Sequence, residues 1–333
     1  MYRSTRLCQP FYRPLVRAIV LMERQILHHS KELEVAMTTL EKIELFNILL
    51  ADDGTENMRA AIQFLADMPQ GKPFSITSLR VFTPTEGSEF ARVDAESQHT
   101  RNLLKSRHFH YTSEMVQGDP APLILKHAEA HHPDLVVLGS KAVGKLGGLL
   151  GNVASDVVHG GKWPVLIARQ PYNGCKRVLL ATDGSEASGH TAAFLNHFPL
   201  HKGASLDILH VVPPVQVTYP IEPAGMAIAA ISPEDEERIN HDNLEHGAKI
   251  LEAEKGMLPS FANITTHLML GDPVEQILSF ARAEQVDLLV CGSRGTGNLA
   301  GWLLGSISRD LVRRAPCSVL VVRNERFSAP SIP

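Results

Sequence analysis

An internal repeat limits the possible folds of this chain more than any other feature of its sequence. Four blocks occur in the same order in both halves: NILLADDGTE at 47–56 with RVLLATDGSE at 177–186, VQGDP at 116–120 with LGDP at 270–273, PDLVVLGS at 133–140 with VDLLVCGS at 286–293, and GNVASDVVHGGKWPVLIAR at 151–169 with GSISRDLVRRAPCSVLVVR at 305–323. The repeat is far longer than the unit of a solenoid protein, so it indicates a duplicated domain.

The repeat divides the chain into three regions. We expect an N-terminal extension at 1–43 that is not part of the core fold, followed by one domain at 44–170 and a second at 175–324. The turn-rich tetrapeptide PYNG at 171–174 joins the two domains. The second domain carries an insertion at 213–240 whose several prolines predict a long surface loop.

Short apolar runs alternate with helical patterns in each half. In the second half the predicted strands are 178–182, 206–212, 264–270, 287–291 and 318–322, and the first half repeats them near Ile48, Ile76, Tyr111, Leu135 and Val165. Several runs are apolar throughout, which is typical of parallel strands covered on both faces. The pattern predicts an α/β fold of two tandem, open, parallel five-stranded sheets with helices on both faces.

Local signals add two expectations about this fold. Asp272 and Pro273 predict a capped helix start, with the helix running from Pro273 to Glu284. The last strands, 165–168 and 319–322, are apolar and nearly free of charge. Exposed edges of this kind invite strand pairing, so we expect an intrachain pseudo-dimer through these strands, with a homodimer as a further alternative.

Charge and cysteine usage exclude several classes of function. The net charge is −4 and the isoelectric point is near 6.5, so no global basic field attracts nucleic acid or an anionic membrane. No apolar run is long enough to span a bilayer. The four cysteines (Cys8, Cys175, Cys291 and Cys317) are scattered, as in a reduced cytoplasmic protein. We therefore expect a cytoplasmic protein with no nucleic-acid and no membrane partner.

The strongest chemical signal is a glycine-rich segment after the fourth strand of the second half, GSRGTGNLAGWLLGS at 292–306. Glycines let backbone N–H groups approach an anion, and a helix starting at Gly305-Ser306 would add its N-terminus to the same place. The segment lacks the lysine of a Walker A loop. It also follows the fourth strand, whereas a Rossmann fingerprint follows the first.

A second signal lies at the carboxyl end of the first strand of the same half. Asp183 stands there, in ATDGSEAS. Ligands of open parallel sheets bind outside the carboxyl ends of the strands, so this carboxylate could accept a hydrogen bond from an adenine amino group or a ribose hydroxyl. A turn or a helix N-cap is the alternative role, because Asp-Gly-Ser also suits both.

At these residues the sequence resembles the universal stress protein family in its tandem form. Gly292, Gly295, Gly305 and Ser306 match the spacing of the family's phosphate motif. The resemblance implies the strand order 3-2-1-4-5 and an ATP molecule lying over strands one and four. Mg²⁺ could accompany the nucleotide, although no paired carboxylates mark a dedicated metal site, and we expect none.

The resemblance also assigns roles to individual residues. It implies that Asp183 and the backbone near Val211 meet adenine, that Cys291 and Gly292 border the ribose, and that Gly295, Gly305, Ser306 and Ile307 hold the phosphates. No residue is expected to act as a catalyst.

The first half departs from the motif. It reads GSKAVGKLGGLLGN at 139–152, with Ala142 in the place of Gly295, one residue fewer before Gly151, and Asn152 in the place of the hydroxyl residue. A shortened loop misplaces its amides relative to phosphates, so we expect this half to bind ATP weakly or not at all. Asp53 is kept, which leaves room for an adenine-like contact.

These observations favour a cytoplasmic ATP-binding stress-response or regulatory protein that acts through an unknown protein partner. It would not be an enzyme, with weak ATPase activity left open. One alternative is an adenylating or ATP-hydrolysing enzyme of similar architecture, although such enzymes usually carry a Ser-Gly-Gly-rich loop where this chain has ATDGSEAS. Another alternative is a nucleotide-free interaction scaffold.

Three further patterns are given structural roles. His127 and His131 lie one helical turn apart, next to His132, a spacing that can bind zinc. We interpret them as a solvated polar face, because the general base of an HExxH site is missing. His210 is interpreted as a hydrogen-bonded histidine at a strand end, and EDEER at 234–238 as a charged helix start.

Overall fold

The computed structural model describes residues 45–56, 58–69, 74–82, 104, 109–140, 151–201, 203–215, 232–293 and 304–323. The chain divides into two units, Met1–Leu45 and Phe46–Pro333, and the fold below is that of the second unit. The expected N-terminal extension, most of the insertion and both glycine-rich loops lie outside the described residues.

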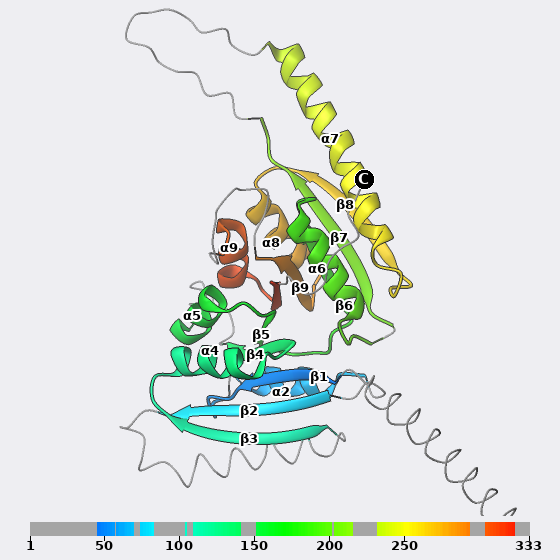
Figure 1. Ribbon diagram of the computed structural model, residues 1–333. Coiled ribbons are helices and arrows are strands. Elements are labelled where there is room, and N and C mark those ends of the chain that lie inside the picture. Colours follow the sequence, from blue (N-terminus) through cyan, green and yellow to red (C-terminus); the bar gives the residue numbers. More distant parts are fainter. Residues whose placement is uncertain are drawn as a thin grey trace, which may run out of the picture. The chain divides into compact units, whose positions relative to one another are not determined.

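Each half contributes five strands and several helices to the described chain (Figure 1). The first half contains β1 (Phe46–Ala51), α2 (Met58–Ala66), β2 (Phe74–Phe82), β3 (His110–Gln117), α4 (Pro120–His131), β4 (Leu135–Ser140), α5 (Asn152–Gly160) and β5 (Val165–Arg169). The second contains β6 (Arg177–Thr182), α6 (Glu186–His197), β7 (Ser205–Val212), α7 (Pro233–Gly256), β8 (Ile264–Leu270), α8 (Pro273–Ala283), β9 (Leu288–Gly292), α9 (Ser306–Arg314) and β10 (Ser318–Val322).

The ten strands form one continuous sheet, in the order β3-β2-β1-β4-β5-β10-β9-β6-β7-β8. Each half therefore has its own strands in the order 3-2-1-4-5, and neighbours within a half are parallel. The prediction of two sheets is wrong in one respect, because the sheets are joined. β5 and β10 pair antiparallel, with Leu166 opposite Leu320. This is the intrachain pairing expected from the two uncharged strands.

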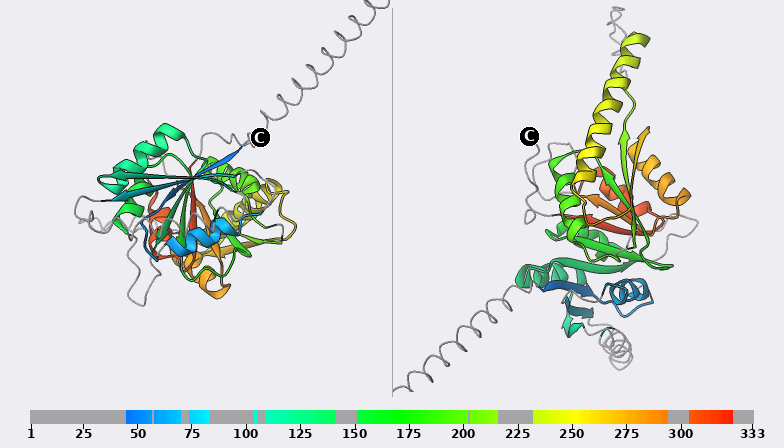
Figure 2. Two further views of the ribbon diagram at one scale, coloured as in Figure 1. Left: turned by 90° about the horizontal axis from the view of Figure 1, so that it is seen from below. Right: turned by 90° about the vertical axis from the view of Figure 1, so that its right-hand side faces the viewer.

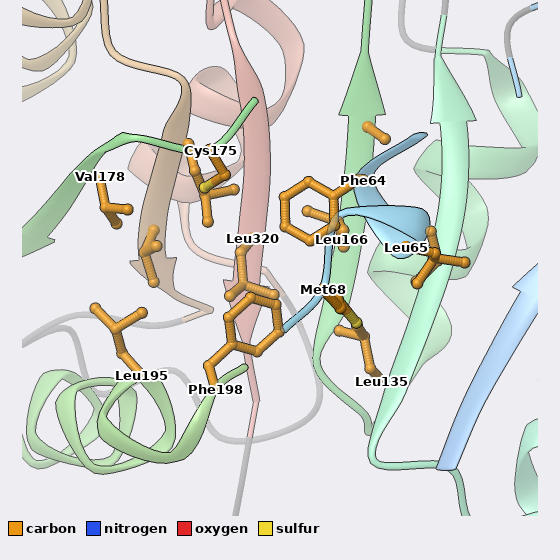
Figure 3. Packing of buried hydrophobic residues seen from close by; sticks show 14 of the residues in the cluster. Phe64, Leu65, Met68, Leu135, Leu166, Cys175, Val178, Leu195, Phe198 and Leu320 are labelled. Carbon is orange, nitrogen blue, oxygen red and sulfur yellow. The ribbon is translucent and has the colours of Figure 1, made fainter. Parts of the chain in front are cut away.

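Buried side chains cover both faces of the sheet. Leu50 and Leu180 belong to one buried cluster, together with side chains of α2, α6 and α7. Their strand neighbours Leu49 and Leu179 point to the opposite face and belong to a second cluster, with side chains of α4, α5, α8 and α9. Figure 3 shows the first cluster at the joint, where Phe198 lies beside Leu320. Strands covered on both faces explain the uninterrupted apolar runs in the sequence.

The insertion of the second half ends in a helix. The loop predicted over 213–240 is wrong for its last residues, because α7 begins at Pro233. Ser232 caps that helix by accepting a hydrogen bond from the Asp235 amide at 3.1 Å, and acidic residues fill the first turn. The predicted helix start at 234–238 is thereby confirmed. Figure 2 shows α7 continuing well past the strands along which it packs, β7 and β8.

The next helix also starts as the sequence predicted. Asp272 accepts a hydrogen bond from the Glu275 amide at 2.9 Å, and Pro273 is the first helical residue of α8. Across the described part of the chain, no helix combines the length and the apolar character needed to cross a membrane.

Val321→Lys should weaken the joint between the two halves. Val321 is fully buried opposite Val165, so the variant places an unpaired ammonium group inside the joint. We expect the free energy of unfolding to fall by about 3 kcal/mol or more, with faster protease cleavage near 170–176. Thermal unfolding and limited proteolysis measure both effects.

Leu270→Lys is the control for this substitution, because Leu270 is 47% exposed at the end of β8. It should change stability by less than about 0.5 kcal/mol. Equal stability losses in the two variants would contradict a role for the β5–β10 joint.

Candidate functional site

A cavity of about 510 Å³ opens in the second half at the carboxyl ends of β6 and β9. It lies where the strand order reverses, with β7 on one side of β6 and β9 on the other. Its walls come from seven elements and their ends: Ala181, Thr182, Asp183, Ser188, His210, Val211, Val212, Pro213, Asn243, His246, Ile250, Pro273, Ile277, Cys291, Gly292, Gly305, Ser306, Ile307, Ser308 and Leu311.

The structure brings seven of the eight predicted site residues to this cavity. They are Asp183, Val211, Cys291, Gly292, Gly305, Ser306 and Ile307. The eighth, Gly295, lies outside the described residues. Ala181 and Cys291, which are 110 positions apart in the sequence, therefore lie side by side in the wall, because β6 and β9 are neighbours in the sheet.

One end of the cavity is the start of α9. Gly305 is the N-cap residue, and no side chain of the described residues caps this helix. The Gly305 amide donates to the Ser293 carbonyl oxygen at 2.8 Å, and the Ser308 hydroxyl donates to the Gly292 carbonyl oxygen at 2.6 Å. These bonds hold the helix start against the end of β9. The first-turn amides of a helix have no partner within it, so this end of the cavity suits an anion.

Asp183 lies at the other side of the cavity and also makes a turn. Its Oδ1 accepts a hydrogen bond from the Ser185 amide at 3.1 Å, so the turn that the sequence offered as an alternative is present. The N-cap of α6 is Ser185, not Asp183. A carboxylate has lone pairs for several donors, so making this turn is compatible with a further hydrogen bond.

Helix α7 supplies a wall that the sequence analysis missed. Asn243, His246 and Ile250 line the cavity from one face of this helix. Their spacing of three and four residues is the helical period, and it was the signal available in the sequence. A helix start was predicted at 234–238, but the spacing alone does not indicate that this helix reaches the site.

A buried carboxylate fixes the last turn of α7 beside the cavity. Glu254 Oε1 accepts hydrogen bonds from the Thr182 hydroxyl and the Ser188 hydroxyl, each at 2.8 Å. Burial raises the pKa of Glu254, the two hydroxyl donors oppose that shift, and the charge of Asp183 adds to it. Glu254 therefore ties α7 to β6 and α6 and sets the position of the cavity wall.

His210 and Cys291 line the cavity from the ends of β7 and β9. His210 Nδ1 lies 2.9 Å from the Thr182 carbonyl oxygen, which confirms the predicted hydrogen-bonded histidine, although its place in the cavity wall was not predicted. Burial raises the pKa of the Cys291 thiol to about 12, with a hydrogen bond involving Ser308 acting in the opposite direction. A thiol with that pKa is protonated at neutral pH and offers packing surface, not a nucleophile.

The equivalent place in the first half is occupied by an ion pair. The strand registers put Arg80 where the second half has His210, and Asp52 where it has Thr182. Arg80 Nη2 donates to Asp52 Oδ2 at 2.7 Å, and both side chains are buried. Asp53, the counterpart of Asp183, makes the same turn by accepting a hydrogen bond from the Thr55 amide at 2.9 Å. The halves thus share the turn, but the first has an ion pair beside it and the second has His210 and Thr182.

Comparison with known proteins identifies relatives of both halves. The model of the universal stress protein family matches residues 45–169 and 174–323. A universal stress protein of Thermus aquaticus is 36% identical over 148 residues, which are 44% of this chain and 98% of that protein. The universal stress protein YxiE of Bacillus subtilis is 32% identical over 155 residues, again 44% of this chain and 98% of that protein.

A solved structure has a similar fold over most of the chain. A universal stress protein from Archaeoglobus fulgidus superposes with a TM-score of 0.57 over 84% of this chain and 99% of that one, at 23% sequence identity. At that identity the similarity concerns the fold.

Ser188→Ala should destabilise the protein more at about pH 8 than at about pH 4.5. The folded-state pKa of Glu254 lies above its ordinary value of 4.5, so protonation adds stability as the pH falls through the raised pKa and the gain is complete below 4.5. The lost donor costs about 1.5–3 kcal/mol against a carboxylate and about 0.5–1.5 kcal/mol against a neutral carboxyl group. Urea unfolding at both pH values measures the difference.

Ser260→Ala is the matched control, because the Ser260 hydroxyl donates to the neutral amide oxygen of Asn196 at 2.6 Å. Its cost should be the same at both pH values. A cost of Ser188→Ala that does not grow with pH would show that Glu254 is not charged in the folded protein.

Proposed function

The chain belongs to the universal stress protein family, a family of stress-response proteins, and from this premise we propose that its second half binds ATP in the cavity at β6 and β9. The observation that carries the proposal is the joining of an anion-binding helix start and a carboxylate in one cavity with apolar walls. A nucleotide needs all three: donors for the phosphates, an acceptor for the base or ribose, and an apolar surface for the ring.

The start of α9 is proposed to bind the phosphates. The amides of Ser306 and Ile307 belong to the first helical turn, and the Ser306 hydroxyl is a further donor. The helix dipole adds partial positive charge at the same end. Gly295 and its neighbours in the glycine-rich segment are proposed to complete the phosphate site.

The base and ribose are proposed to lie between Asp183 and the α7 wall. Asp183 accepts from the adenine amino group or a ribose hydroxyl, and Val211 and Ile250 give apolar surface. Asn243 and His246 add polar groups on the opposite side. The ring would thus be enclosed by the end of a strand and by α7.

The first half is proposed not to bind ATP. Its phosphate loop is one residue shorter in sequence, and the Arg80–Asp52 pair stands beside the turn of Asp53. An arginine in the place of His210 puts a long buried side chain where the second half lines its cavity. The expected stoichiometry is therefore one nucleotide per chain.

The bound nucleotide is proposed to regulate an interaction with another protein in the cytoplasm. ATP contacts both ends of the glycine-rich segment in this proposal, so it favours some conformations of that segment over others, and such a difference can bias partner binding. The three described cysteines, Cys175, Cys291 and Cys317, are free and buried, which supports a reducing compartment.

Asp183→Ala and Asp53→Ala form a matched pair that tests the site. Each removes a carboxylate that accepts a backbone hydrogen bond in the same turn. Asp183→Ala should weaken ATP binding about 10- to 100-fold, corresponding to about 1.5–3 kcal/mol for a hydrogen bond to a charged group. Asp53→Ala should leave the affinity unchanged. Calorimetric titration with ATP measures both.

The same titration can include Gly295→Val and its first-half counterpart Ala142→Val. A β-branched side chain restricts the backbone and occupies space that a phosphate needs, so Gly295→Val should abolish binding while Ala142→Val has no effect. Two equivalent ATP sites in the unmodified protein would contradict the proposed asymmetry. Loss of binding in the first-half variants alone would show that the site lies in the first half.

Hydrolysis of the bound ATP should be slow or absent. Phosphoryl transfer needs a placed base or water-orienting group and neutralisation of charge at the γ-phosphate. The cavity wall near Ser306 and Ile307 offers amides and hydroxyl groups, and the nearby Cys291 thiol is neutral. Incubation with ATP and chromatography of the products should give almost no ADP plus phosphate and no AMP plus pyrophosphate. A turnover near about 1 s⁻¹, or release of pyrophosphate, would instead support an enzyme.

A further inference from the structure

Three possible metal ligands meet in the first half, far along the sheet from the ATP cavity. Glu114 of β3 and His127 and His131 of α4 each offer one ligand atom, and these atoms lie within 4.8 Å of one another. The interpretation of both histidines as a solvated face is wrong for His127, whose side chain is only 11% exposed. The sequence showed the two histidines, and the fold brings the carboxylate to them.

The two histidine rings contact each other, the helix backbone and Glu114. His131 Nδ1 lies 3.0 Å from the His127 carbonyl oxygen, which can only accept, so Nδ1 carries the proton and Nε2 keeps its lone pair. A hydrogen bond of this kind orients metal-binding imidazoles. The two rings stack with their centroids 4.0 Å apart, and His127 Nδ1 lies 3.7 Å from Glu114 Oε2.

Three effects act on the pKa of His127. Burial lowers the pKa of His127, and the neighbouring His131 lowers it further, while Glu114 acts in the opposite direction. A neutral imidazole is the form that coordinates metal ions. His127 Nε2 is buried and has no hydrogen-bond partner among the residues that the structure describes.

In the second half, the residues at the equivalent positions make a ring contact and ion pairs. The repeat places His267 where the first half has Glu114, Phe280 where it has His127, and Glu284 where it has His131. The rings of His267 and Phe280 contact each other with centroids 4.6 Å apart. His267 Nε2 lies 2.8 Å from a carboxylate oxygen of Asp207. That half therefore combines a ring contact with charge pairing.

The charge pairing of the second half has no equivalent in the first. Arg177 pairs there with both Asp207 and Glu284, at 2.8 Å each. By the strand registers, the first half has Asn47 and Thr77 at the positions of Arg177 and Asp207, and neither is charged. Glu114 and the two histidines thus form a cluster of possible metal ligands at positions where the second half has a ring contact and ion pairs.

We propose that Glu114, His127 and His131 bind a divalent transition-metal ion, with Zn²⁺ as the natural occupant. Two imidazoles and one carboxylate are a recurrent zinc ligand set, and a water molecule would take the fourth position. Ligand atoms of a tetrahedral zinc ion with bonds of about 2.0–2.1 Å are about 3.4 Å apart. Glu114 is 46% exposed and His131 is also exposed, so both side chains can rotate to close this distance.

The ion would link the outermost strand β3 to helix α4. β3 is an outermost strand of the ten-stranded sheet, and alternate side chains along it are exposed. Coordination by Glu114 of β3 and two residues of α4 links that edge strand to the helix that follows it. Metal that binds only the folded state stabilises it, so zinc should raise the unfolding temperature of the first half.

The test is titration of the nucleotide-free full chain with Co²⁺ and then Zn²⁺. Co²⁺ in a tetrahedral site reports through its visible absorption, and displacement by Zn²⁺ gives the zinc affinity. Glu114→Gln and His131→Ala change exposed side chains, so both variants should fold. His110→Ala is the control, because His110 is an exposed histidine of the same strand that does not belong to the cluster.

The unmodified protein and His110→Ala should give the same cobalt spectrum and zinc affinity. Glu114→Gln and His131→Ala should each bind zinc at least tenfold more weakly and lose the spectrum. Saturating Zn²⁺ should raise the unfolding temperature of the first pair of proteins and not of the second. Zinc affinities that agree within twofold across all four proteins, or the absence of a tetrahedral cobalt spectrum, would overturn the proposal.

Discussion

Two buried arginines hold the duplicated halves in one sheet, and the rest of the structure depends on this joint. Arg169, at the end of β5, donates to the carbonyl oxygens of Val312 and Ala315, where α9 of the other half ends. Arg323, directly after β10, donates to the Gly161 carbonyl oxygen, where α5 ends. Each half thus supplies the cation that satisfies orphan carbonyl groups at the helix end of the other half. Burial lowers the pKa of Arg169 to about 10, which still leaves it charged at neutral pH.

This joint connects the half without a complete phosphate loop to the site in the other half. The proposed phosphate-binding helix α9 is short, and both of its ends are held: Gly305 is bonded to the Ser293 carbonyl, and the last turn is bonded to Arg169. A helix start can serve as an anion site only if the helix itself cannot shift. The first half therefore contributes to the proposed nucleotide site by fixing α9, and the residues that line the cavity all belong to the second half. This gives a physical reason for a duplicated chain to keep a half that is proposed not to bind ATP.

The two halves share their backbone fold and differ in the side chains at two places on it. Beside the shared Asp-Gly turn, the first half has the buried pair of Arg80 and Asp52, and the second has His210 in a cavity wall. On the outermost strand of each half, the first half has Glu114 beside His127, and the second half has His267 packed against Phe280. The backbone registers at these places are the same, so substitution alone changed the chemistry. One fold thereby carries two separate candidate sites, one in each half.

The sequence by itself determined the duplication, the ten strands and the position of the helix start at Gly305 and Ser306 that lines the cavity. The strand limits predicted for the second half agree with the structure to within one residue, because uninterrupted apolar runs ended by turn residues have few alternatives. The pairing of β5 with β10 was expected from their uncharged apolar residues, and the structure added that it is antiparallel and joins the two sheets into one. Only the tertiary structure decided two other matters: that Asn243 and His246 of α7 line the cavity, and that Glu114 joins two histidines. Each depends on side chains distant in sequence that meet through packing, and local periodicity carries no information about which strand or helix lies opposite.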